Sequence, residues 1–493
     1  MAMKNALMVM LLLVFTISVL AQGALLAGGG GKRRPADIPL PTAVAAQKTL
    51  SIVLGRPTDT SIIANILSLA TVEGYIEYGS AAGKYEQKTA LQTFPANSPT
   101  EVLIDGLKPD TQCFYRLLTR PMGQTTYAAG SEYSFHTQRA PGSSFSFAIQ
   151  GDSHPERIQQ FDPALYAQTL SAVAAGHPDF YLTIGDDFSV DTLPAITADT
   201  VKQVYLRQRY FLSLVGQSAP LFLVNGNHEQ AAKYNLDGTA NNVAVWAQNS
   251  RNSLFPQPAP DRFYTGDAQQ VEFIGSLRDY YAWTWGDALF VTIDPYWHSA
   301  QPVDNVIGGG AKRTDLWEVT LDSAQYQWLK KTLEESKSKY KFVFTHHVLG
   351  TGRGGVEEAG LYEWGGQDKR GFNQFAAKRP GWELPIHQLM VKNGVTIFFQ
   401  GHDHIFVRQQ LDGVIYQTLP EPADPYYTLY NSDAYLTGDK QANSGYVRVN
   451  VAPEKVTVDY VREYLPKDET AQQRSGETSF SYTVPAVKPT ITK

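Results

Sequence analysis

The feature that most constrains this chain is a set of five short segments, each of which ends an apolar run with metal-binding side chains. In order they are Gly151-Asp152-Ser153-His154, Gly185-Asp186-Asp187, Gly226-Asn227-His228-Glu229, His346-His347 and Gly401-His402-Asp403-His404. A lone His or Asp carries little information, but five such segments within one α/β-like region are very hard to obtain by chance. Together they supply enough nitrogen and oxygen donors for two metal ions.

The apolar runs before these segments predict buried strands at 145–150, 180–184, 221–224, 289–293, 342–345 and 395–399, with helices at 164–175, 201–214 and 324–335. Four of the six strands lead within a few residues to a candidate ligand, and a fifth reaches His402 across Gln400 and Gly401. Open α/β sheets place their sites at the carboxyl ends of their strands. We therefore expect the segments to meet at one edge of a sheet.

A different pattern precedes this region. Short alternating strands at 72–78, 101–104, 113–118 and 132–136 are separated by turn residues, which predicts an all-β sandwich over residues 46–138. The stretch from Leu107 to Tyr115 resembles the corner of a fibronectin type III module, with Cys113 where that family usually has its corner Tyr. We expect Cys113 to be a small buried residue with an inert thiol.

The sequence predicts further boundaries around these two domains. Arg139-Ala140-Pro141-Gly142 separates the sandwich from a catalytic domain at 143–466, which closes with a hairpin at 446–451 and 456–464. Residues 467–493 are expected to form a loose polar tail. A Gly-, Arg- and Pro-rich linker is expected at 25–45.

The first 24 residues resemble a secretory signal peptide, because Lys4 precedes an apolar run that ends in small residues. This predicts an exported protein, periplasmic or secreted, with no transmembrane anchor after processing. An uncleaved membrane anchor is the alternative, and Lys32-Arg33-Arg34 would then favour a cytoplasmic body. The single Cys excludes an internal disulfide. A net charge of −6 without a sustained basic run argues against nucleic acid as a partner.

The five segments in this order resemble the calcineurin-like metallophosphoesterase superfamily, whose pattern is GDxH, a GDxxD-like segment, GNH[E/D], a strand-end His and GHxH. The preceding sandwich is similar to the domain order of purple acid phosphatases. The resemblance implies an α/β fold, a four-layer β-sandwich flanked by helices, preceded by an all-β fibronectin- or Ig-like domain. It also implies two divalent metal ions, with Mn, Fe and Zn all compatible with nitrogen and oxygen ligands.

The resemblance implies two ligand sets that share Asp186 as the bridging carboxylate: Asp152, His154 and His404 for one ion, and Asn227, His346 and His402 for the other. Adjacent side chains at a strand end point apart, so only one of His346 and His347 is expected to bind. The family pattern favours His346. Purple acid phosphatases carry a Tyr ligand three residues after the bridging Asp, and this chain has Ser189 there. Their tyrosinate colour and Fe(III) preference are therefore not implied.

Two further residues are candidates for contact with substrate. His228 resembles the family's substrate-facing His, which would stabilise or protonate the leaving oxygen; a purely structural role is the alternative. Arg353 lies in the glycine-rich stretch 350–355, directly after the His pair, where it would bind a substrate phosphate with two donors. A solvated Arg on a flexible loop is the alternative.

The sequence thus predicts a metal-dependent phosphoric ester hydrolase similar to acid phosphatases. It would act on phosphorylated small molecules or esters by attack of a metal-bridging hydroxide, with His228 assisting the leaving group. A phosphodiesterase or nucleotidase of the same fold is an alternative. A non-catalytic cell-surface binding protein with a vestigial site is another, although a dead site would usually have lost at least one ligand.

Overall fold

The computed structural model describes residues 39–303, 315–349 and 352–486. The predicted signal peptide at 1–24 and most of the predicted linker lie outside the described residues, as does the end of the chain. The described residues from Leu40 onward form one compact unit. It begins with a short helix, α2 (Thr42–Ala46), where the sequence predicted linker. The linker is shorter than predicted because Val44 is fully buried in the core beside helix α4 (Ala198–Gly216).

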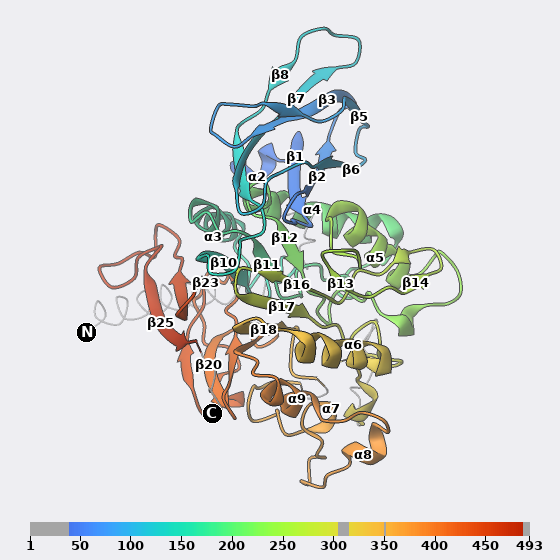
Figure 1. The fold of residues 1–493 in the computed structure, drawn as a ribbon, viewed down its shortest axis with the longest axis vertical. Helices are drawn as coiled ribbons and strands as arrows, with labels where there is room; N and C mark the ends of the chain where they lie inside the picture. The colour runs from blue at the N-terminus through green and yellow to red at the C-terminus, as the bar shows by residue number, and fades with distance from the viewer. Residues whose placement is uncertain (1–38, 304–314, 350–351, 487–493) are drawn as a thin grey trace, which may run out of the picture. The chain divides into compact units, whose positions relative to one another are not determined.

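The first part of this unit is all β, as predicted (Figure 1). One sheet has the order β1 (Leu50–Gly55), β2 (Ile62–Ser68) and β6 (Thr100–Ile104). The other is built on β3 (Val72–Gly79) and β7 (Gln112–Pro121), joined by β4 (Gln87–Lys88), β5 (Gln92–Phe94), β8 (Ala128–Ala129) and β9 (Tyr133–His136). The two sheets share one core, which includes Ile52, Ile76 and Tyr115.

The sequence missed β1 and β2, for a physical reason. Both strands are buried along nearly their whole length, so their apolar residues do not alternate with polar ones. The outer face of this sheet is covered by α4, whose Arg209 donates hydrogen bonds to Ser51 and Asn65. The sandwich is therefore packed against the next domain through a polar, buried contact.

Two larger sheets form the rest of the unit among the described residues. The first has the order β12 (Leu221–Leu223), β11 (Tyr181–Thr183), β10 (Phe145–Gln150), β23 (Gly445–Ala452), β24 (Lys455–Arg462) and β25 (Thr478–Pro485). The second has the order β13 (Thr265–Gly266), β16 (Tyr281–Trp285), β17 (Ala288–Thr292), β18 (Tyr340–Phe344), β19 (Ile397–Gln400), β21 (Val414–Thr418), β20 (Phe406–Leu411) and β22 (Asp439–Gln441). A separate small hairpin joins β14 (Gln270–Val271) to β15 (Gly275–Ser276).

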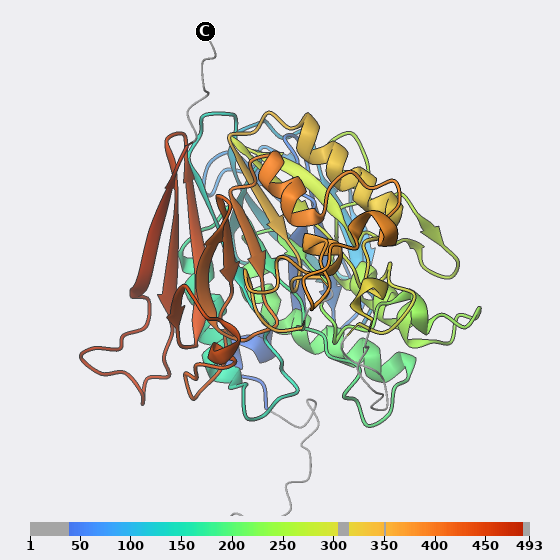
Figure 2. The same cartoon turned by 90° about the horizontal axis from the view of Figure 1, so that it is seen from below.

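The two sheets pack face to face over an aromatic core in which Phe147, Phe290 and Phe344 are fully buried. Helices α3 (Pro163–Ala175), α4 and α5 (Val243–Leu254) cover the outer face of the first sheet. Helices α6 (Asp322–Glu335), α7 (Tyr362–Gly365) and α9 (Ile386–Lys392) cover the second, with α8 (Phe375–Lys378) beside α7 (Figures 1 and 2). The predicted four-layer α/β sandwich is confirmed.

Two sets of parallel strands bring the metal-binding segments together. Strands β10, β11 and β12 are parallel, as are β17, β18 and β19. Their carboxyl ends therefore lie at the same edge of the stacked sheets. Short 3₁₀ helices occupy the loops at Lys233–Asn235, Leu316–Glu318 and Ser432–Ala434.

The loose polar tail predicted from residue 467 is wrong over Thr478–Pro485, which forms β25 and pairs antiparallel with β24. Every second side chain of this strand, Phe480, Tyr482 and Val484, packs against the core between the sheets. Alternating polar residues lowered the apparent hydrophobicity of the segment, but alternation is what an edge strand requires.

Over the described residues, no helix has the length and apolar character needed to cross a membrane.

Candidate metal centre

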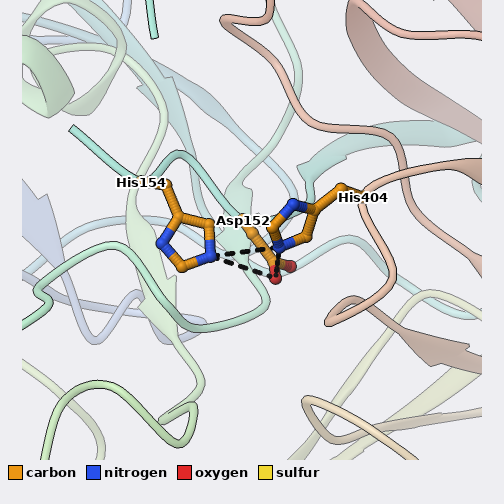
Figure 3. A group of neighbouring side chains, drawn as sticks. All are labelled: Asp152, His154 and His404. Carbon is orange, nitrogen blue, oxygen red and sulfur yellow. Dashed lines mark hydrogen bonds and ion pairs between the residues drawn. The ribbon is translucent and has the colours of Figure 1, made fainter. Parts of the chain in front are cut away.

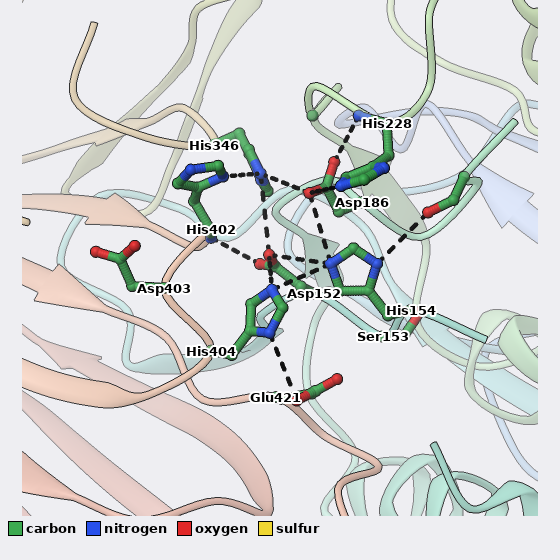
Figure 4. A network of polar contacts seen from close by, with 12 residues as sticks. Asp152, Ser153, His154, Asp186, His228, His346, His402, Asp403, His404 and Glu421 are labelled. Atoms are coloured by element: carbon green, nitrogen blue, oxygen red, sulfur yellow. Dashed lines mark hydrogen bonds and ion pairs between the residues drawn. The ribbon is translucent and has the colours of Figure 1, made fainter. Parts of the chain in front are cut away.

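The five segments converge in the structure, and the seven predicted ligands are all buried. Figure 4 shows the side chains of the Asp and His candidates turned toward one another from strand ends that are far apart in the sequence. Six of these side chains fall into two groups that share the region around Asp186, and His228 forms a further, overlapping group with His154 and Asp186.

The first group is Asp152, His154 and His404 (Figure 3). Nε2 of His404 lies 3.1 Å from Oδ2 of Asp152, and Nε2 of His154 lies 3.7 Å from the same oxygen. Nε2 of His154 and Nε2 of His404 are 3.1 Å apart. One carboxylate oxygen and two imidazole nitrogens thus surround a single point.

The second group is Asp186, His346 and His402. Nε2 of His346 lies 3.0 Å from Oδ2 of Asp186 and 3.2 Å from Nδ1 of His402. The same Asp186 oxygen lies 3.6 Å from Nε2 of His154 in the first group. Asp186 therefore stands between the two groups, where a bridging carboxylate would be needed.

The spacing of the nitrogens fits metal ions. Two ligands held at Zn–N distances of about 2.0–2.1 Å, at tetrahedral or right angles, are roughly 3–3.4 Å apart. The facing pairs His154–His404 and His346–His402 are separated by 3.1 and 3.2 Å. The other nitrogen of His346, Nδ1, donates to the backbone oxygen of Ile184 at 2.9 Å, which leaves the Nε2 lone pair directed at the centre.

Asn227 gives a second sign that the centre is built for cations. Its side chain is buried, yet among the described residues neither amide atom has a hydrogen-bond partner. A buried amide without partners costs about 1–3 kcal/mol. A metal ion bound through the carbonyl oxygen would remove part of that cost.

The electrostatics of the centre also favour positive charge. Burial alone would lower the pKa of His346, but the carboxylates of Asp186 and Asp152 outweigh it and raise the pKa to about 10. Burial would raise the pKa of both carboxyls, and the surrounding imidazoles instead hold it well below the usual range. Burial lowers the pKa of His404 to about 4 against the opposing effect of Asp152, so this imidazole is a neutral donor.

Carboxylates outside the two groups hold the turns in place. Glu229 accepts hydrogen bonds from the backbone nitrogens of Asp186, Asp187, Phe188 and Gly226, so it ties the turn after β11 to the turn after β12. Glu421 is fully buried and its Oε2 lies 3.8 Å from Nδ1 of His404. Oδ1 of Asp187 accepts from Gln150 and Ser153 rather than facing the centre.

The turns themselves need unusual backbone. His154, Asp186, His402 and His404 all have positive φ, between 41° and 68°, which non-glycine residues adopt rarely. Gly185 has φ 101°, and a Cβ on Gly401 would lie 2.3 Å from Oδ1 of Asp152. The glycines in these segments therefore serve two needs: left-handed backbone at Gly185 and close approach at Gly401.

His228 lies at the edge of the centre, 3.8 Å from Oδ2 of Asp186 through its Nε2 atom. Its Nδ1 contacts Oδ1 of Asp191 at 2.8 Å, and Nη2 of Arg157 lies 3.0 Å from Nε2. Burial alone would lower the pKa of His228, but Asp186 and Asp191 raise it to about 9. The sequence analysis missed Asp191 and Arg157, because neither belongs to the five segments. Only the closeness of Asp191 to Asp186 and of Arg157 to His154 in the sequence could have suggested these two residues.

The structure separates the remaining candidates. Nδ1 of His347 contacts the hydroxyl of Tyr296 at 2.6 Å, and its ring stacks on His402 with centroids 4.6 Å apart. The guanidinium of Arg353 contacts Oδ1 of Asp403 at 3.0 Å and the backbone oxygen of His402, and so holds the loop that carries this candidate ligand. Both contacts are made by Nη1 of Arg353. Oγ of Ser189 lies 3.5 Å from Nδ1 of His154.

Comparisons with known proteins agree with this geometry. Residues 145–406 match the family described as calcineurin-like phosphoesterase. The structure of purple acid phosphatase PPD1 from yellow lupin (Lupinus luteus) seeds matches with a TM-score of 0.55 and 16% identity, covering 88% of this chain and 74% of that one. The structure of PhoD matches with a TM-score of 0.62 and 14% identity, covering 91% of this chain and 92% of that one. At these identities the two structures show a shared fold. No curated protein sequence matches the chain.

Proposed function

The chain belongs to the calcineurin-like phosphoesterase family, and from this we propose that it is a phosphatase that hydrolyses phosphate esters at the centre between Asp152 and Asp186. One observation carries the proposal: the His228–Asp191 pair faces the same Asp186 oxygen that lies between the two metal-binding groups. A proton donor is thus supported at the place where a leaving oxygen would depart.

The donor set fits two divalent ions. Asp152, His154 and His404 would hold one, and His346, His402 and Asn227 would hold the other, with Asp186 between them. When bound, such a pair of ions would neutralise the negative charge of the phosphoryl oxygens and activate the attacking water. Mn, Fe and Zn all suit these nitrogen and oxygen donors.

His228 is proposed to protonate the leaving oxygen. Asp191 holds Nδ1–H and so fixes the ring with Nε2 toward the centre. The raised pKa of His228, about 9, keeps the imidazole protonated near neutral pH. A donor placed in this way contributes roughly 10²–10⁴-fold to the rate.

Arg157 is the stronger candidate for a phosphate contact. Its guanidinium lies beside His228 Nε2, and its side chain is 30% exposed. With His228 protonated, Arg157 Nη2 and His228 Nε2 are both donors, and a phosphoryl oxygen bound there would accept charge-assisted hydrogen bonds from both. Arg353 remains a second candidate, and its engagement with Asp403 makes it the weaker one.

The test compares three variants on two substrates, an alkyl phosphate and nitrophenyl phosphate. We expect His228→Ala to retain its metal ions and lose roughly 10²–10⁴-fold in kcat on the alkyl ester. The loss should be much smaller on nitrophenyl phosphate, whose leaving group needs little protonation. Asp191→Asn should show the same difference between the two substrates with a smaller loss of kcat, because Asp191 orients the His228 ring without touching substrate.

Asn227→Ala is the matched comparison, since it removes the neighbouring side chain. It should lower metal content, and added metal should restore part of the activity. An equal loss on both substrates for His228→Ala, together with lost metal, would show that His228 is structural.

A parallel assay distinguishes a phosphatase from a phosphodiesterase or nucleotidase. Its substrates are phosphomonoesters, phosphodiesters, nucleotides and pyrophosphate. Absence of activity on all of them with Mn²⁺, Fe²⁺ and Zn²⁺ would favour the binding-protein alternative.

We also propose that the mature protein is exported, on the evidence of the apolar segment after Lys4.

A further inference from the structure

A separate group of metal-binding side chains lies outside the catalytic centre: Asp267, Asp279 and His298. One ligand atom from each lies within 4.8 Å of the others, and the three residues are 2%, 1% and 8% exposed. Asp267 follows β13, Asp279 precedes β16, and His298 lies in the loop after β17. Three separate segments thus place donors at one buried point.

The imidazole of His298 is oriented like that of a metal ligand. Its Nδ1 contacts Oδ2 of Asp322 at 2.9 Å, and its Nε2 lies 3.2 Å from Oδ2 of Asp279. The other oxygen of Asp322 caps α6 by accepting from the backbone nitrogens of Ala324 and Gln325. A carboxylate that holds one ring nitrogen fixes the ring and leaves the other nitrogen as the donor to a metal.

Asp267 gives an independent sign of a missing partner. Oδ1 accepts from the backbone nitrogen of Gln269 at 2.7 Å, but Oδ2 is buried and meets no hydrogen-bond donor among the described residues. Its carboxylate lies beside that of Asp279, with one ligand atom of each within 4.8 Å of the other. Two carboxylates held this close need a proton or a cation between them.

We propose that Asp267, Asp279 and His298 bind a single divalent transition-metal ion of the Zn²⁺ class, separate from the catalytic pair. One imidazole and two carboxylates are a mixed nitrogen and oxygen set, which suits Zn²⁺ or a similar ion. Ca²⁺ is disfavoured because it takes six to eight oxygen ligands. Water would complete the coordination.

The position of this site gives the ion a structural role. It joins the β13–β16 edge of the second sheet to the loop after β17 and, through Asp322, to the start of α6. The same loop after β17 contains Asp294, whose Oδ2 accepts from Nδ2 of Asn225 at 2.6 Å. Asn225 lies two residues before the candidate ligand Asn227, so the bound ion would steady the support of the catalytic turn without contacting substrate.

The experiment counts Zn²⁺ ions in the full-length protein after loading and removal of excess metal. We expect Asp267→Asn and His298→Gln each to hold one Zn²⁺ per chain fewer than the wild type. The same difference of one should appear in an Asp186→Asn background, in which the catalytic centre is impaired. The comparison therefore does not depend on the proposed phosphatase activity or on how many ions the centre holds.

His387→Gln is the matched control, because His387 is also buried and contacts a carboxylate, Asp412, at 3.1 Å. Its other nitrogen meets the hydroxyl of Tyr416 rather than a second carboxylate, so we expect no loss of metal. Zinc-edge anomalous diffraction from wild-type crystals should show a peak between Asp267, Asp279 and His298. This measurement uses wild-type crystals, so it tests the proposal even if the variants do not fold. Unchanged Zn²⁺ content in both variants, or no peak in a Zn²⁺-loaded crystal, would overturn the proposal.

Discussion

Among single residues, Cys113 shows how burial alone sets chemistry. The side chain is 4% exposed within the core of the sandwich, and Sγ lies 3.8 Å from the backbone oxygen of Thr111. Burial raises the pKa of the thiol from 9.0 to about 11. The neutral thiol is therefore the form that packs in the folded protein, as the sequence predicted for a small buried residue.

This shift predicts a pH-dependent loss of stability at high pH. Because the folded pKa is raised, the contribution is fully present below about pH 9 and is lost as the pH rises toward about 11. The stability advantage of the wild type over Cys113→Ala should shrink by on the order of 2 kcal/mol across that window. Urea unfolding at several pH values measures it. A constant difference between the two proteins from pH 8 to 11 would contradict the shift. The native thiol should also resist thiol reagents at pH 8.

At the scale of elements, the turn from β19 into the loop with His402 depends on the absence of a side chain at Gly401. A Cβ there would lie 2.3 Å from Oδ1 of Asp152 and 2.5 Å from Cγ2 of Ile184. The backbone nitrogen of His402 donates to the same Asp152 oxygen at 2.8 Å. Strand end, turn and metal-binding side chain are thus one packed assembly.

We expect Gly401→Ala to push Asp152 and His402 apart, because overpacking of this kind costs about 1–3 kcal/mol. Metal content and activity should fall together, with a lowered Tm. Gly360→Ala is the control, since a Cβ at that position would meet no atom within 4 Å. Full metal content and activity in Gly401→Ala would mean that the loop can shift without consequence.

At the scale of the whole molecule, Arg209 joins the sandwich to the catalytic domain. Its guanidinium is fully buried and donates to Ser51 Oγ, to both oxygens of Asn65 and to the backbone oxygen of Leu254. Burial lowers the pKa of Arg209 to about 9. All of these acceptors are neutral groups, so hydrogen bonds rather than an ion pair hold the contact. The sandwich is therefore anchored by buried oxygen atoms to which this side chain donates.

Arg209→Leu should destabilise the protein by roughly 1–3 kcal/mol for each buried acceptor left without a donor. Limited proteolysis should also become faster at 139–142, between the two domains. Denaturation curves and digestion time courses measure the two effects. The control Lys202→Gln changes an exposed cation on the same helix and should alter neither. If Arg209→Leu matched the wild type in both assays, apolar packing alone would hold the domains together.

The export proposal concerns the first residues of the chain. Protein recovered from its native host should lack the apolar segment and begin near Gln22 or Leu25. N-terminal sequencing decides this directly. An intact Met1 on mature protein would revive the membrane-anchor alternative.

The sequence alone determined the fold class and supplied a set of candidate metal ligands. Both rest on local patterns: buried apolar runs predict parallel strands, and a ligand directly after a strand must lie at the end of that strand. The predicted strand at 145–150 coincides with β10, and six of the seven side chains predicted as ligands lie in two buried groups.

Only the tertiary structure decided which distant residues complete each group. Asp191 reaches His228, Glu229 caps the turn before Phe188, and β25 completes a sheet. Asp267, Asp279 and His298 likewise have no local pattern that marks them as a set. A contact between residues far apart in sequence depends on how layers pack, and packing is set by the summed burial of many side chains rather than by any one segment.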